Sequence, residues 1–125
     1  MSADISELLD YALQLDNAVS DATPKLSKMV ERGANNIKRD ARAILSGYSR
    51  RGHLKHYPRS FGYDMITPLE AEVGPEADKK QGGMGRGVEF GSVHTKPMPH
   101  WMPAADLEEP RFGKGAADIL WKAMR

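Results

Sequence analysis

Residues 23–47 read TPKLSKMVERGANNIKRDARAILSG, and this stretch decides the fold because it predicts one long amphipathic helix. Thr23 is a residue type that caps helices, Pro24 suits the first helical position, and Ser46-Gly47 favours a stop. A helix of this length spans roughly 33 Å, so its apolar stripe needs a partner along its whole length. The stripe consists of Leu26, Met29, Val30, Ile37, Ala41, Ile44 and Leu45.

A shorter helix is expected upstream, over residues 5–15. Apolar residues recur there at spacings of three and four, and polar residues occupy the opposite side. Asp4 or Ser2 is a suitable cap, and acids in the first turn suit the helix dipole. The chain is therefore predicted to begin with two helices.

The segments after residue 47 predict a small antiparallel sheet followed by helix. Strand-like stretches at 60–66 and 69–73 flank Thr67-Pro68 and favour a hairpin, and a third strand is expected at 88–91. A final helical region is expected after Pro103, with Pro110 and two glycines, Gly113 and Gly115, splitting it. The predicted fold is α+β, with two long N-terminal helices and a C-terminal helical region packed on the small antiparallel sheet.

Length and composition exclude several classes of protein. The 125 residues (13.8 kDa) suit a single domain, 1–125, and 40% apolar residues supply a modest core. No cysteine is present, which excludes disulfides, thiolate nucleophiles and cysteine-ligated metals. The N-terminal segment is acidic and no apolar run approaches a membrane span, so we expect neither a signal peptide nor membrane insertion.

The net charge of +1 conceals four blocks of alternating sign. Residues 1–24 hold five acids and no Lys or Arg, whereas residues 25–63 hold ten Lys or Arg against two acids. Residues 64–78 again hold five acids and no base, and residues 79–125 hold eight bases against five acids. Such blocks pair within the chain, pair between neighbouring copies, or form solvated faces.

No convincing catalytic, cofactor or metal motif is present, and we expect a protein that is not an enzyme and has no cofactor. The glycine-rich loop 79–87 lacks the Lys and hydroxyl of a phosphate-binding loop and is read as a flexible loop that orders against a partner. His53 and His56 are expected to be solvated or interfacial, as are His94 and His100, because a zinc site needs three or four rigid ligands. Ser92 lies near His94 without a nucleophile elbow or an orienting acid.

The basic loop 47–59 mixes cations with aromatic side chains. Its cations include Arg50, Arg51, Lys55 and Arg59, and its aromatic residues are Tyr48 and Tyr57. This composition is typical of surfaces that contact phosphates or stack on bases, so a small nucleic-acid-binding protein using residues 48–59 is one alternative. The other interpretation pairs the loop with an acidic block of a neighbouring subunit.

Two short motifs near the C-terminus suggest a family. Val88-Glu89-Phe90-Gly91-Ser92 is followed by Pro99-His100-Trp101-Met102-Pro103-Ala104, a pair that resembles a signature of small neck and tail-component proteins of long-tailed bacteriophages. Gly52-His53-Leu54, Arg59-Ser60-Phe61 and residues 70–75 also resemble family segments, so the likeness covers about residues 5–124. The chain departs from the family in the turn after the second helix, at residues 46–52, and in its longer 52–60 segment.

The resemblance implies a structural virion protein of the head-tail connector, assembled in the host cytoplasm. It implies a homo-oligomeric ring, sixfold or twelvefold, that contacts adjacent connector or stopper proteins and the tail terminator or tail tube, while DNA passes through without sequence-specific binding. A tail terminator of the same assembly is the close alternative. Candidate interface residues are Arg50, Arg51, Lys55, Arg59, Glu89, Phe90 and Trp101, with Glu89 and Phe90 on opposite faces of a strand and Trp101 a rigid anchor or a core residue.

Overall fold

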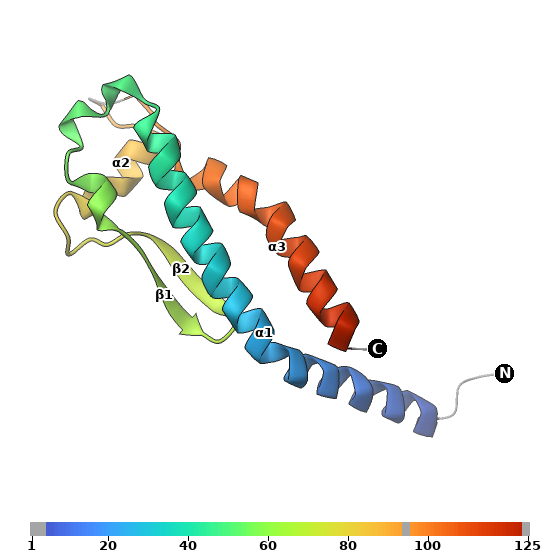
Figure 1. Cartoon of the computed structure of the whole chain (residues 1–125). Helices are drawn as coiled ribbons and strands as arrows, with labels where there is room; N and C mark the ends of the chain where they lie inside the picture. Colours follow the sequence, from blue (N-terminus) through green and yellow to red (C-terminus); the bar gives the residue numbers. More distant parts are fainter. Residues whose placement is uncertain (1–4, 94–95, 124–125) are drawn as a thin grey trace.

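The computed structural model describes residues 5–93 and 96–123, with the side chains of 5–16, 18–19, 50 and 51 not described. The described part is built from long helices and one hairpin, so the predicted α+β class is confirmed (Figure 1). Its helices and strands are α1 (Ile5–Ser46), β1 (Phe61–Thr67), β2 (Glu70–Pro75), α2 (Gly85–Phe90) and α3 (Trp101–Ala123). Short 3-10 turns occupy η1 (Ser49–His53), η2 (Tyr57–Ser60) and η3 (Gly82–Met84).

Helix α1 is one helix of 42 residues rather than two, so the prediction of two long N-terminal helices is only partly correct. Pro24 lies inside α1, and its side chain is exposed. An interior proline removes one backbone hydrogen bond and bends a helix without necessarily ending it. Figure 1 shows this bend in the blue part of α1, before the helix continues beside α3.

Helix α3 runs back along α1 as an unbroken antiparallel partner, so the predicted split is wrong. Pro110 and Gly113 both lie on its exposed side. Gly115 instead serves the packing, because a Cβ there would come within 2.6 Å of the Met29 Cε atom. One of the glycines interpreted as a helix breaker is thus the point of close approach between the two helices.

The hairpin is confirmed and packs against α1 (Figure 1). Strands β1 and β2 are antiparallel, with Phe61 opposite Pro75 and Tyr63 opposite Val73, and the turn lies at residues 68–69. The third strand predicted at 88–91 is wrong, because these residues fall mostly in helix α2. The sheet has two strands only in the part of the chain that the structure describes.

The hydrophobic core lies where the end of α1 meets α2 and the start of α3. Tyr57, Leu45 and Met98 are its largest fully buried hydrophobic side chains. They are joined by Ala41, Leu54, Phe61, Val88 and Ala104. The core therefore brings together both halves of the 88–104 motif and the end of the basic loop. None of the described helices is long and apolar enough to cross a membrane.

Candidate functional site

The two halves of the motif are folded together by a chain reversal after α2. The Met98 amide donates to the Val88 carbonyl at 2.8 Å, and the Gly91 amide donates to Gly87 at 2.9 Å. Gly91 has φ 87°, and a Cβ there would lie 2.9 Å from the Pro97 ring. Glycine is therefore required at this reversal, both for its conformation and for the close approach of the chain.

Glu89 is buried, 5% exposed, and closes the N-terminus of α3. Its carboxylate accepts hydrogen bonds from the backbone amides of His100 at 3.0 Å, Trp101 at 2.8 Å and Met102 at 3.1 Å. These amides belong to the donors that a helix start leaves unpaired, and a negative charge there suits the helix dipole. Glu89 and Phe90 do face opposite environments, but from a helix: Glu89 points inward and Phe90 is 62% exposed.

A chain of buried hydrogen bonds continues from Glu89 through His100 to Tyr57. The His100 Nδ1 atom lies 2.7 Å from the Met98 carbonyl and 3.1 Å from the Glu89 carboxylate, which places the proton on Nδ1. The Nε2 atom then accepts from the Tyr57 hydroxyl at 2.8 Å. The Tyr57 oxygen in turn accepts from Trp101 Nε1 at 3.1 Å. We call Glu89, His100, Trp101 and Tyr57 the Glu89 junction. No buried side-chain N or O atom of the described residues lacks a hydrogen-bond partner.

The pKa shifts at the junction favour the neutral forms of His100 and Tyr57. Burial lowers the pKa of His100 below its ordinary value of 6.5, against the opposing effects of the Met98 carbonyl and Glu89. Burial also raises the pKa of Tyr57 to about 12. Both groups are fully buried, so they cannot meet a substrate in this arrangement. The hydrogen bonds of the junction hold the start of α3 against Tyr57 of the basic loop.

Two residues that the sequence placed on a surface are thus in the core. His100 was expected to be solvated or interfacial, and Tyr57 was expected to contribute to a stacking surface, yet both are 0% exposed. Trp101 is half-buried and its ring lies 4.4 Å from that of Phe61, which supports the core interpretation. One feature of the sequence indicates this arrangement. His100 precedes α3 and is not a residue type that caps helices well, so the free amides at the start of α3 need an acceptor from elsewhere in the chain.

Gln81 joins the basic loop 47–59 to the glycine-rich loop 79–87. Its side-chain oxygen accepts from the His56 and Tyr57 amides at 2.7 and 3.0 Å, and its nitrogen donates to the His53 carbonyl at 2.8 Å. Gly82 is buried, and a Cβ there would collide with the Glu76 carbonyl. The expectation that residues 79–87 hold no regular structure is wrong, since they include η3 and the start of α2. That this segment orders against a partner stays a prediction.

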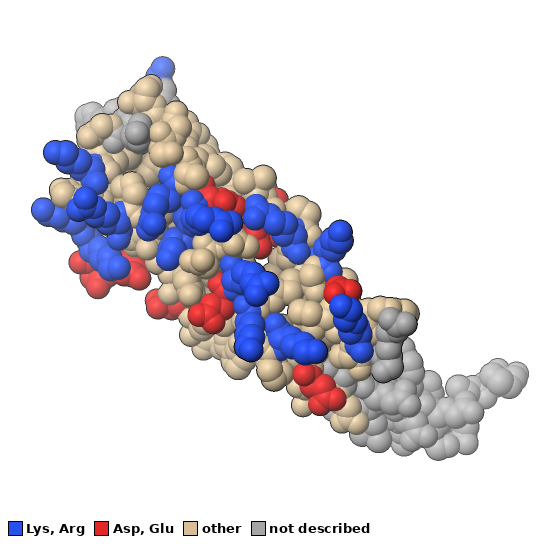
Figure 2. Space-filling model, viewed as in Figure 1, with Lys and Arg blue, Asp and Glu red and all other residues tan. Residues whose placement is uncertain are grey.

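Figure 2 shows one face of the molecule, on which many Lys and Arg lie along α1 and over the loops beside its C-terminal end, with Asp and Glu among them. Lys55 and Arg59 are exposed, and neither forms an ion pair with the described side chains. Arg50 and Arg51 lie in η1, and their side chains fall outside the described part of the structure. A basic stripe of exposed side chains follows α1: Lys25, Lys28, Arg32, Arg39 and Arg42.

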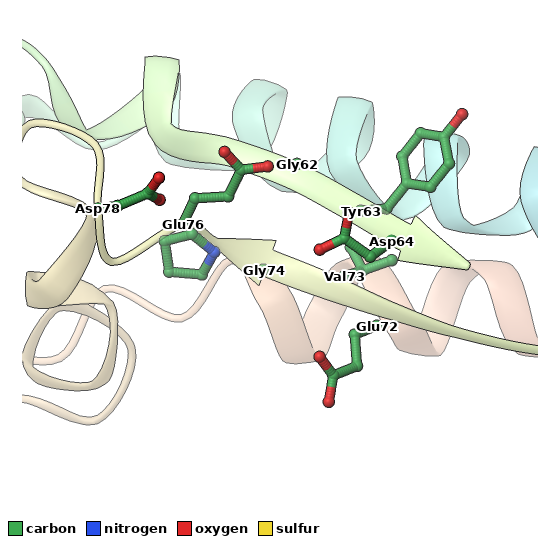
Figure 3. Close-up of a pocket in the computed structure, with 9 residues that line it drawn as sticks. Gly62, Tyr63, Asp64, Glu72, Val73, Gly74, Glu76 and Asp78 are labelled. Carbon is green, nitrogen blue, oxygen red and sulfur yellow. The ribbon is translucent and has the colours of Figure 1, made fainter. Parts of the chain in front are cut away.

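The hairpin carries an acidic hollow of about 800 Å³ (Figure 3). Its acidic lining residues are Asp64, Glu72, Glu76 and Asp78. Figure 3 shows Glu76 reaching back over Gly62, and its carboxylate pairs with Lys79 at 2.9 Å. The other three have no ion pair among the described residues. Most acids of the 64–78 block thus lie on one surface of the hairpin.

The described residues contain no group of three or more His, Asp or Glu placed to hold a metal ion. His94, which lies near Ser92 in the sequence, is outside the described residues. No protein-family model, curated protein or solved structure matches this chain significantly. The resemblance to phage neck proteins therefore remains a prediction from the motifs.

Proposed function

We propose that this protein is a non-enzymatic component of the neck of a long-tailed bacteriophage, forming a ring between the DNA-filled head and the tail tube. The observation that carries the proposal is the Glu89 junction. The two motifs on which the resemblance rests are separated in sequence, yet Glu89 binds the backbone of His100, Trp101 and Met102 and makes them one unit. The two motifs thus form one structural feature, which supports treating them together as a family signature.

The charge distribution supports assembly into a ring. A closed ring requires a heterologous contact, in which one surface meets a different surface of the next copy. The acidic hollow of the hairpin and the basic face with Lys55 and Arg59 are two such surfaces, and they are exposed in the single chain. Pairing between copies would set their orientation and register. The adjacent connector or stopper and the tail terminator or tube are the proposed neighbours.

The first test is electron microscopy of lysates from the source virus with this gene disrupted. Filled heads beside separate tails of normal length are expected for a neck protein. Over-long tails would instead assign the protein as tail terminator, the alternative within the same assembly. Intact infectious particles would exclude both roles.

The proposed contact through the basic face is tested by reversing charge. Arg50→Glu with Arg51→Glu should prevent incorporation into particles, measured by complementation of the disrupted gene and by mass spectrometry of purified virions. Lys25→Glu is the control, because Lys25 is exposed and lies in α1 far from the C-terminal end of that helix, where the basic loop begins. Normal incorporation of the double variant would exclude this pairing.

The 79–87 segment is proposed to reach an adjacent ring or the tail tube. Deleting it would remove Gln81 and buried Gly82 and disturb folding, so charge reversal at exposed Lys80 and Arg86 is the appropriate experiment. The variant should fold normally and give particles that join heads to tails poorly. Unchanged infectivity would contradict the proposed contact.

Nucleic-acid binding is a second candidate, favoured by the basic face in Figure 2. Lys and Arg on a single face can neutralise phosphates, and such binding weakens steeply as salt rises. Duplex binding by the purified protein that falls with salt and with Lys55→Glu and Arg59→Glu would support this candidate. Absence of binding at low salt would remove it.

A further inference from the structure

The basic stripe follows a single line along the surface of α1. Its positions recur at alternating spacings of three and four residues, which keeps them on one face of a helix. Every position of the line is exposed and polar: Lys25, Lys28, Arg32, Asn35, Arg39 and Arg42. At a rise of about 1.5 Å per residue, the line is roughly 26 Å long. The stripe therefore presents five cations and one amide in a row.

The acids beside the stripe bond to other elements. Glu31 accepts a hydrogen bond from the Tyr63 hydroxyl of β1 at 3.1 Å. Asp40 pairs with Arg111 of α3 at 3.0 Å, and it lies 3.7 Å from Arg39 of the stripe. These carboxylates therefore serve the contacts of α1 with the hairpin and with α3, and they neutralise little of the charge of the stripe.

The first cations of the stripe have no internal partner. Lys25, Lys28 and Arg32 form no ion pair with any described side chain. Asp21 occupies the next position of the same line, four residues before Lys25, and marks the end of the stripe. Most of the positive charge between these limits is thus available to an anion outside the chain.

Arg42 joins the stripe to the basic loop 47–59. Its guanidinium donates two hydrogen bonds to the Pro58 carbonyl, at 3.2 and 3.3 Å. Arg59 follows Pro58 and is exposed, as is Lys55. The positive surface therefore continues from α1 onto the end of the loop, on the face shown in Figure 2.

The composition of the stripe favours nucleic acid over an acidic protein as its partner. Protein interfaces have an apolar centre in which a few large side chains supply most of the affinity. None of the large hydrophobic side chains that are exposed among the described residues lies on α1. Interfaces with nucleic acid are instead more polar and much more positive. Lys, Arg and Asn, the residue types of the stripe, are among those that contact phosphates.

We infer that the basic stripe binds the phosphate backbone of double-stranded nucleic acid, with α1 lying along the duplex. A duplex is favoured over a single strand because single strands are bound through stacked aromatic side chains, and the stripe has none. The contacts are to phosphates, so binding does not depend on base sequence. The inference deepens the second candidate function, since it moves the contact from the loop to α1, and it does not depend on a neck role.

The test is fluorescence anisotropy of a labelled DNA duplex of about 20 base pairs, titrated with the full-length protein at several salt concentrations. The logarithm of the association constant should fall linearly with the logarithm of the salt concentration, with a slope of about −4 to −5 if all five cations contact phosphates. A second duplex of unrelated sequence should bind equally well.

The decisive variant is Lys28→Gln with Arg32→Gln, because both side chains are exposed and neither has an ion pair with the described residues. The slope should move toward zero by about two, and the dissociation constant at low salt should rise about tenfold or more. Gln is a good helix former, so α1 should stay intact, which circular dichroism checks.

Lys114→Gln with Lys122→Gln is the matched control, because it removes two exposed positive charges from α3 instead. It should bind the duplex with the slope of the wild type. Equal losses in the two variants would show a general effect of net charge and overturn the inference. A loss confined to Lys55→Gln with Arg59→Gln would assign the binding to the basic loop and overturn it as well.

A wild type that does not bind the duplex at low salt also overturns the inference. Self-association that the Lys28→Gln, Arg32→Gln variant loses would then assign the stripe to a contact between copies. The inference and the neck proposal fail separately. Duplex binding through the stripe upholds the inference even if disruption of the gene leaves intact particles, whereas separate heads and tails without duplex binding uphold only the neck role.

Discussion

The Glu89 junction and the acidic hollow of the hairpin both contain carboxylates, but in opposite environments. The Glu89 carboxylate is buried and has three backbone amides as partners. Asp64, Glu72 and Asp78 are exposed, and no described residue pairs with them. The Glu89 carboxylate stabilises the fold through internal hydrogen bonds, whereas we propose that the exposed carboxylates contact other molecules. Mutations in the two regions should therefore have separable effects.

The largest effect is expected for Glu89→Ala. The change leaves three amides at the start of α3 without their acceptor, and hydrogen bonds to charged groups contribute roughly 1.5–3 kcal/mol each. We expect the free energy of unfolding to fall by about 3 kcal/mol or more, measured by urea denaturation.

Glu72→Ala is the matched control, because Glu72 is an exposed carboxylate on β2. Its effect on the free energy of unfolding should stay within about 0.5 kcal/mol. Similar losses for the two variants would show that the buried junction has no special role in stability.

A smaller loss is expected for Tyr57→Phe. Removing the hydroxyl leaves His100 Nε2 and Trp101 Nε1 unpaired, which costs about 2 kcal/mol in the free energy of unfolding. Tyr63→Phe is the control, since that hydroxyl bonds Glu31 at 3.1 Å at an exposed position. Equal urea midpoints for the two variants would contradict the assigned hydrogen-bond chain.

A pH dependence should follow from the burial of His100. Its pKa is lowered in the folded chain, so below pH 6.5 the unfolded chain binds the proton more readily. The free energy of unfolding should therefore be greatest above pH 6.5 and fall as the pH drops, by at most about 1.4 kcal/mol per pH unit from this group.

Urea denaturation of His100→Asn at several pH values tests this dependence, and the slope below pH 6.5 should flatten. His56→Gln serves as a comparison, because His56 also has a lowered pKa but lies at a partly exposed position. The prediction fails if His56→Gln flattens the slope and His100→Asn leaves it unchanged.

The smallest effect on stability is expected on the charged surface. Lys55→Glu with Arg59→Glu changes two exposed, unpaired side chains, so the free energy of unfolding should move by less than about 0.5 kcal/mol. Incorporation into particles should nevertheless be lost, measured by complementation of the disrupted gene. A strongly destabilised variant would contradict the proposal that these surface charges serve contacts with other molecules and contribute little to stability.

The sequence predicted the elements whose signals are local. The β1–β2 hairpin was found because turn residues separate two strand-like stretches, and the helical regions followed from apolar spacing. Predictions that used proline or glycine as helix breakers were wrong, because tertiary position decides whether a helix accommodates them. Pro24 and Pro110 lie at exposed positions and are accommodated inside α1 and α3, and Gly115 is required by Met29 on the opposite helix.

The candidate site was less predictable because it depends on contacts distant in sequence. Residues 88–91 alternate in a way that four residues cannot assign to a strand or a helix, and α2 is chosen by the Glu89 contact with α3. No local rule indicates that Gln81 would bind the backbone of the basic loop. Lys55 and Arg59 were placed correctly on the surface, since charged side chains rarely lie in a core.

The antiparallel contact of α1 with α3 also determines the order of events when the chain is made. Helix α1 is synthesised before α3, so the apolar stripe of α1 stays without this partner until α3 has been translated. Such distant pairing slows folding and leaves apolar surface open to other molecules in the meantime. Truncated chains that end before residue 101 should therefore aggregate or be degraded, and the cell would accumulate only chains that include α3.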